Sequence, residues 1–214
     1  MAIINPYTLK IALKELVNTQ NSILKDNVTD DIADVIINHS LGAAAAGLGS
    51  AWIPGIGGTA ALFASVGFIW SMYFRINKCL GLKLSKTLLK SLASAIITNI
   101  AASAASVIGG AAVSTVLSFI PGIGTVTASI IMAGVVYAAV FASGLIYIKL
   151  LTSLFKAGKD PSKMTEEQLK SAAASAVKES DVSKIIKDAK KDYVSARKSG
   201  SVNGDEKVDL EKDD

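Results

Sequence analysis

Hydrophobic residues dominate the middle of this chain in two long stretches that no charged residue interrupts. There is no Asp, Glu, Lys or Arg between Asp34 and Arg75, and none in the 58 residues between Lys90 and Lys149. A surface helix of a soluble protein normally keeps one polar, mostly charged face toward water. The two stretches are therefore predicted to be enclosed by apolar material, either lipid or the interior of a helical bundle.

The pattern within these stretches predicts four helices arranged as two hairpins. We expect helices over about 30–52 and 58–79 in the first hairpin (30–80), and over about 84–118 and 123–155 in the second (84–155). The sequence IPGIG occurs at 53–57 and again at 120–124, so the chain contains an internal repeat. Proline cannot continue a helix, and glycine permits a tight reversal. The predicted turn residues are Pro54, Gly55, Gly57, Pro121, Gly122 and Gly124.

Both ends of the chain are more polar than the middle. Residues 1–29 contain an amphipathic helix over about 8–26, with leucines on one face. In the segment 159–198, Thr165 and Gln168 have the spacing of a capping box, and Ser180-Asp181 is a second helix start. Residues 199–214 are rich in Gly, Ser and mixed charges, which is typical of a disordered tail. The predicted fold class is all-α.

Composition and charge favour a membrane protein over a soluble one. Half of the 214 residues are hydrophobic and only 19% are charged, against about 25% in soluble domains. The uncharged segment from Val126 to Ile148 exceeds the roughly 20 residues that span a bilayer core. The helix that contains it closes with Tyr147, Lys149 and Lys156, an aromatic and basic edge of the interfacial kind. We therefore predict that residues 30–158 form a membrane-embedded domain.

A basic segment over 75–90, the basic elbow, joins the two hairpins and contains no acid. It could mark the cytoplasmic side of the membrane, or it could bind anionic lipid head groups. Either role would place both termini on the cytoplasmic side. Its basic residues are Arg75, Lys78, Lys83, Lys86 and Lys90.

Small residues recur at every fourth position along the third predicted helix. This spacing lets two helix backbones approach closely in lipid, and the fourth helix has a similar row as a candidate partner. An Ala-rich soluble helix would show a similar face. The first row is Ser94, Thr98, Ala102, Ser106, Gly110, Ser114 and Ser118, and the second is Gly134, Ala138 and Ala142.

Residues that would indicate an enzyme are scarce. His39 is the only histidine and Cys79 the only cysteine, which excludes a histidine-based metal site and an intrachain disulfide. No phosphate-binding loop is present, and no glycine cluster follows a strand. Asn99, inside the uncharged run, is expected to bond across a helix interface. We therefore predict no enzyme, no cofactor and no metal site, and the scattered lysines are a poor surface for nucleic acid.

The two hairpins resemble a known family. The resemblance covers about residues 40–155, and rests on IPG at 53–55, the apolar helix continuing through 68–85, and the second half from 119–127 through 142–145. It is a helical domain of unknown function that follows the G domain in some Era-like GTPases, and that also occurs as stand-alone bacterial inner-membrane proteins. The resemblance implies a location in a bacterial inner membrane. It supplies no catalytic residues, and this chain has no G domain.

Together these features predict a membrane-docking or scaffold protein. Its partners would be the lipid bilayer, another copy of the chain, and a GTPase or other protein bound through the tail helices at 165–198. Two alternatives remain open at this stage. One is an oligomeric pore built on the small-residue rows, and the other is a soluble or amphitropic helical bundle whose uncharged runs form its core.

Overall fold

The computed structural model describes residues 7–19, 27–50, 65–103 and 125–211. In these ranges the chain is all-helical and contains no strand, which confirms the predicted fold class. A short 3-10 turn, Pro161–Lys163, precedes the last two helices. The α-helices are α1 (Tyr7–Thr19), α2 (Val28–Ser50), α4 (Val66–Leu80), α5 (Lys86–Ser103), α7 (Thr125–Lys156), α8 (Glu166–Lys178) and α9 (Val182–Lys198).

Local sequence signals explain several helix ends. The Thr165 hydroxyl accepts a hydrogen bond from the Gln168 amide, and the Gln168 side chain accepts one from the Thr165 amide, so the predicted capping box starts α8. Asp181 caps α9 by accepting from the Lys184 amide at 3.0 Å. Gly81 ends α4 in the left-handed conformation, with φ of 69°, which an L side chain rarely adopts.

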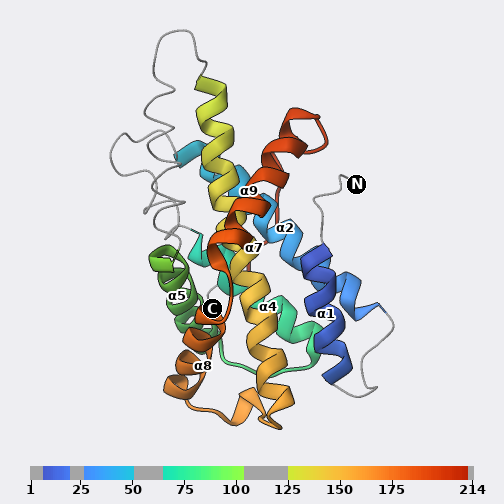
Figure 1. The fold of residues 1–214 in the computed structure, drawn as a ribbon, viewed down its shortest axis with the longest axis vertical. Helices are drawn as coiled ribbons and strands as arrows, with labels where there is room; N and C mark the ends of the chain where they lie inside the picture. The colour runs from blue at the N-terminus through green and yellow to red at the C-terminus, as the bar shows by residue number, and fades with distance from the viewer. Residues whose placement is uncertain (1–6, 20–26, 51–64, 104–124, 212–214) are drawn as a thin grey trace.

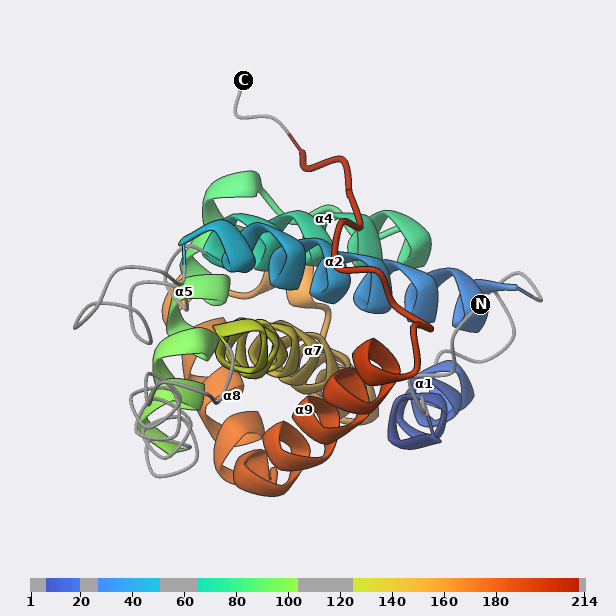
Figure 2. The same ribbon diagram turned by 90° about the horizontal axis from the view of Figure 1, so that it is seen from above.

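The helices surround α7, which lies at the centre of the bundle (Figures 1 and 2). Viewed from above, α2 and α4 cover one side of α7, α5 lies at the second, α8 and α9 at the third, and α1 at the fourth. Every residue from Met132 to Ile148 is buried. A helix that is apolar all round must be enclosed on all its faces, and here other helices of the same chain enclose it.

The two-hairpin membrane prediction is supported only in its coarser part. Among the described helices, only the α7 segment Ile130–Lys156 is long and apolar enough to cross a membrane. By length and composition, the core helix of a soluble protein passes the same test, and 89% of its most apolar window is buried inside the bundle. The predicted turn residues Pro54, Gly55, Gly57, Pro121, Gly122 and Gly124 lie outside the described residues.

The chain ends also join the bundle. Helix α1 buries Leu9, Leu13 and Leu16, as its amphipathic pattern predicts, and ends at Thr19 within the described residues. Helices α8 and α9 pack on α5 and α7, so the polar segment 159–198 is part of the core. The predicted disordered tail begins at 199, but residues 201–211 lie along α2 and α4 (Figure 2).

Candidate functional site: the apolar helix α7 and its cover

Helix α7 has the dimensions of a membrane span. Its apolar segment Ile130–Lys156 has 27 residues, which at 1.5 Å per residue is about 40 Å of helix. A bilayer core is about 30 Å thick, so the segment could span it. In the structure, every residue of its central part, from Met132 to Ile148, is buried. The candidate site is therefore α7 together with the helices that separate it from the surroundings.

Helix α9 covers α7 with a narrow apolar stripe. The stripe has the alternating spacing of three and four residues of an amphipathic helix, a periodicity that is present in the sequence although α9 is polar overall. Its outer face carries exposed Lys184, Lys187 and Lys191. The buried residues of the stripe are Val182, Ile186, Ala189, Tyr193 and Ala196.

Close contacts join α9 to α7 at a glycine. A Cβ at Gly134 would lie 3.3 Å from both the Lys190 Cγ and the Val194 Cγ2, and 3.4 Å from the Tyr193 ring. The rings of Tyr193 and Tyr137 stack beside it with centroids 5.2 Å apart. The absence of a side chain at Gly134 therefore lets α9 approach the backbone of α7.

This same contact leaves two polar groups unsatisfied. The hydroxyls of Tyr137 and Tyr193 are buried and have no hydrogen-bond partner. Each such group costs about 1–3 kcal/mol relative to a hydrated hydroxyl. The α7–α9 interface is therefore well packed but carries a penalty that hydration of the two phenols would remove.

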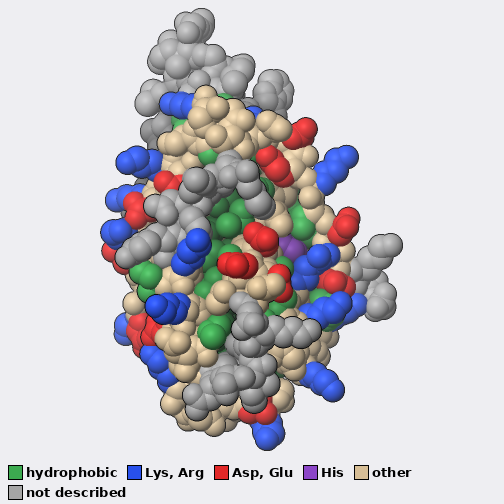
Figure 3. Space-filling model, turned by 90° about the vertical axis from the view of Figure 1, so that its right-hand side faces the viewer, with side chains coloured by type: hydrophobic (Ala, Val, Ile, Leu, Met, Phe, Trp, Pro, Cys, Tyr) green, Lys and Arg blue, Asp and Glu red, His purple; other side chains and the backbone are tan. Residues whose placement is uncertain are grey.

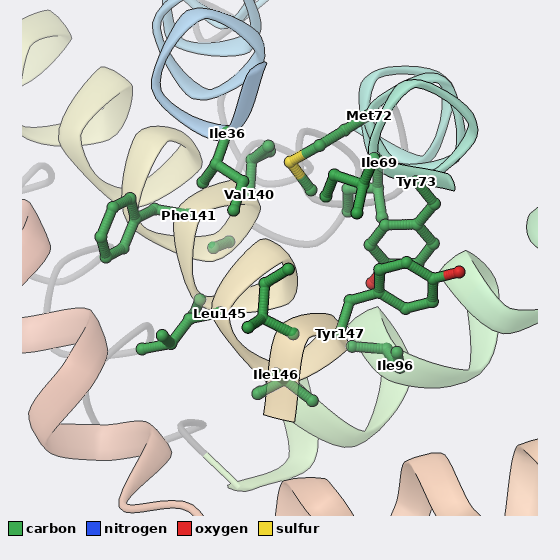
Figure 4. Close-up of a cluster of buried hydrophobic side chains, with 14 of the residues drawn as sticks. Ile36, Ile69, Met72, Tyr73, Ile96, Val140, Phe141, Leu145, Ile146 and Tyr147 are labelled. Carbon is green, nitrogen blue, oxygen red and sulfur yellow. The ribbon is translucent and has the colours of Figure 1, made fainter. Parts of the chain in front are cut away.

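On the opposite side of α7, both tyrosine hydroxyls have hydrogen-bond partners. Tyr73 of α4 and Tyr147 of α7 stack with ring centroids 4.0 Å apart (Figure 4). The Tyr73 hydroxyl shares a hydrogen bond of 2.5 Å with the Ser143 hydroxyl, and the Tyr147 hydroxyl donates to the Asn77 side-chain oxygen at 2.8 Å. Both phenol hydroxyls on the α4 side therefore form hydrogen bonds, whereas neither phenol hydroxyl on the α9 side does.

The two small-residue rows have different surroundings. Gly134, Ala138 and Ala142 are buried in the bundle. On α5, Ser94, Thr98 and Ala102 are exposed, and the helix packs through its leucines and isoleucines instead. The structure therefore does not bring the described parts of the two rows together. Ser106, Gly110, Ser114 and Ser118 lie outside the described residues.

The basic elbow does not form one continuous cationic patch. The Arg75 guanidinium donates to the Asp209 carbonyl at 2.6 Å, and the Lys90 ammonium lies 4.9 Å from the centroid of the Trp70 ring. Lys86 is half-buried. Lys78 and Lys83 are exposed and line an open hollow of about 530 Å³ together with Phe74, Leu82 and Leu84. Two cations beside apolar side chains suit a lipid–water interface.

Cys79, Asn99 and His39 all lie in environments that suit a structural role. Burial raises the pKa of the Cys79 thiol, which favours an unreactive cysteine over an activated one. The Asn99 amide donates to the Ala95 carbonyl of its own helix at 2.8 Å, and not to a neighbouring helix as expected. His39 is buried between α2 and α4. Within the described ranges, no three His, Cys, Asp or Glu side chains are grouped as metal ligands.

Comparison with protein-family models, with curated proteins and with solved structures gives no match for this chain. The resemblance to the GTPase-associated helical domain therefore stays a prediction, and the assignment of function rests on the geometry of α7 and its cover.

Proposed function

We propose that this chain is a non-enzymatic, membrane-associating protein that holds α7 inside a helical bundle and releases it into a bilayer. The observation that carries the proposal is the burial of the one described helix able to span, with charged helices as its outer layer. Of the alternatives that the sequence leaves open, this is the amphitropic bundle. The docking role is kept, with α7 as the anchor.

The charges on α9 support release over permanent insertion in this arrangement. Exposed Lys184, Lys187 and Lys191 lie on the outer face of the helix that covers the middle of α7. A lysine at the bilayer centre costs about 2.5–3.5 kcal/mol on the insertion scale. Helix α9 must therefore move away before α7 can occupy the bilayer core.

The contacts around α7 also favour α9 as the helix that moves. The unsatisfied hydroxyls of Tyr137 and Tyr193 gain water or head-group partners when α9 leaves, and tyrosine is a preferred residue at membrane interfaces. The α4 side keeps its bonded tyrosine pair. Lys78 and Lys83 at the elbow hollow supply a first contact with anionic head groups.

A protein partner, such as the GTPase that the resemblance implies, would have to use surfaces other than the buried stripes of α8 and α9. Those stripes contact α5 and α7 in the bundle. We infer that such a partner binds the outer faces of the two helices, or binds their apolar faces after release.

A disulfide across the α7–α9 interface tests the proposal. The Val194 Cγ2 lies 3.3 Å from a Cβ built at Gly134, so Gly134→Cys with Val194→Cys places two sulfurs within bonding reach. Cys79→Ser is included so that one disulfide alone forms. We expect the oxidised chain to stay behind when vesicles of zwitterionic and anionic phospholipid are floated, and the reduced chain to float with them.

The matched control is the Cys79→Ser chain under the same oxidising and reducing conditions, which should float equally well in both. Flotation of the oxidised double-cysteine chain at the level of the reduced one would show that α7 need not leave α9. If neither form floats, membrane association itself is wrong.

A further inference from the structure

The chain does not end at α9, and the segment that follows it crosses two other helices. Residues 201–211, here termed the C-terminal strap, leave the end of α9 and pass over α2 and α4 (Figure 2). Gly200 and Gly204, with φ of 71° and 81°, supply the left-handed turns at its start. Val202 is buried, and the Arg197 guanidinium donates to its carbonyl at 3.0 Å. The strap therefore ties the end of α9 to the other side of the bundle.

Three contacts hold the far part of the strap. Val208 packs on α2 where Gly42 has no side chain, since a Cβ there would lie 2.5 Å from the Val208 Cγ1. The Arg75 guanidinium donates to the Asp209 carbonyl at 2.6 Å. The Glu211 amide donates to the Ser71 hydroxyl oxygen at 3.0 Å. Ser71 is thus the innermost anchor of the strap.

The only histidine of the chain contacts that anchor. His39 is 1% exposed, and its Nδ1 lies 2.8 Å from the Val35 carbonyl oxygen. A carbonyl only accepts, so Nδ1 carries the proton and Nε2 is the acceptor in the neutral ring. The Ser71 hydroxyl, 3.3 Å from Nε2, is then the donor to the ring, while its oxygen accepts from the Glu211 amide. With the neutral imidazole, every donor and acceptor in this series of hydrogen bonds has a partner.

A second proton on His39 removes the acceptor of the Ser71 hydroxyl proton. It would occupy Nε2, where it faces the Ser71 hydroxyl proton, so Ser71 must turn its proton away while it still accepts from Glu211. Arg75 of α4 adds a positive charge beside the ring. Burial, aided by the positive charge of Arg75 and opposed by the hydrogen bond to the Val35 carbonyl, lowers the pKa of His39 from 6.5 to about 4.

The charged groups around this site come from two elements. Helix α4 contributes Arg75, and the strap contributes Asp209 and Glu211. The acids of α2 lie at or before Asp34, more than one turn from His39. The α7 sequence has no acid or base before Lys149. Figure 3 shows the histidine in purple, with acidic and basic side chains around it.

We propose that His39 and Ser71 form an acid-sensitive latch that holds the C-terminal strap on α2 and α4 at neutral pH and releases it as the pH falls. The direction of the pH dependence follows from the linkage between proton binding and strap attachment. Because the folded, strapped state binds the proton more weakly than exposed histidine, strap attachment is complete above pH 6.5 and weakens as the pH falls toward 4. Release frees the end of α9 and needs no membrane, so the latch can be tested apart from the proposed function.

Hydrogen exchange of the strap amides, corrected for the intrinsic effect of pH, measures release directly in lipid-free buffer. If exposed His39 regains its ordinary pKa, linkage predicts a loss of protection of up to about 20-fold between pH 7 and pH 5. The non-titrating variant His39→Gln should show no such loss. Unchanged protection in the wild type, or an equal loss in His39→Gln, would overturn the latch.

A proton NMR titration of His39 gives a second readout that does not require changing the histidine. Because the chain has one histidine, its ring resonance needs no assignment, provided that the purification tag contains none. Gly42→Val fills the space of Val208, so it should lift the strap and raise the pKa of His39 toward 6.5. Gly67→Val is the matched control, because a Cβ at Gly67 meets nothing within 4 Å. An equal pKa of His39 in both variants would contradict the latch.

Discussion

Replacing Ile186 by Asp is expected to detach α9 from α7 and to lower the free energy of unfolding by at least about 3 kcal/mol. Ile186 is 1% exposed at the centre of the α9 stripe. The substitution removes a buried aliphatic side chain and places an unpaired carboxylate in the same apolar site. Chemical denaturation followed by circular dichroism measures the loss, and vesicle flotation should increase because α7 loses its cover.

The neighbouring substitution Lys187→Asp is the control for Ile186→Asp. Lys187 lies on the exposed face of the same helix, so its replacement introduces the same side chain at nearly the same position without burial. Surface substitutions of this kind usually change stability by less than about 0.5 kcal/mol. Equal stability of the two variants would mean that the α9 stripe does not pack on α7 in solution.

Replacing Gly144 by Val is expected to destabilise the other side of α7 by about 1–3 kcal/mol, because it overpacks the contact with α2 and α4. A Cβ at Gly144 would lie 3.0 Å from the Ile36 Cγ2 and 3.1 Å from the Met72 sulfur. Figure 4 shows Ile36 and Met72 pointing toward α7. The midpoint of urea denaturation measures the effect.

A second substitution distinguishes overpacking from a general effect of valine at this position. Ile36→Ala removes the atoms nearest to the new side chain, so the double variant should be more stable than the sum of the two single losses predicts. Strict additivity would contradict the contact between Ile36 and Gly144.

Local signals in the sequence predicted the helices well. The Thr165 capping box and the leucines of α1 are short-range features, and the structure confirms both. Whether an uncharged helix contacts lipid or protein depends on residues far away in the sequence. An uncharged run such as Val126–Ile148 is equally suited to lipid and to a protein interior, and only the helices that cover it decide between them.

Two features of the structure depend on packing that composition does not predict. The stripe at Val182, Ile186 and Tyr193 is a periodic apolar pattern within a helix that is highly charged overall. The strap has the composition of a disordered tail, and its fixed course depends on contacts with Gly42 and Ser71, which lie far away in the sequence. Composition reports average solubility, whereas packing depends on which few residues face a partner.

Fractionation of cells that produce the full chain tests the central claim most directly, namely that α7 is covered within the bundle and enters a bilayer only on release. The account predicts a pool that is soluble and monomeric without detergent, together with a membrane pool that resists a carbonate wash. The purified soluble pool should bind added vesicles. A chain found entirely in membranes, and extracted only by detergent, would contradict the covered arrangement and favour permanently spanning hairpins.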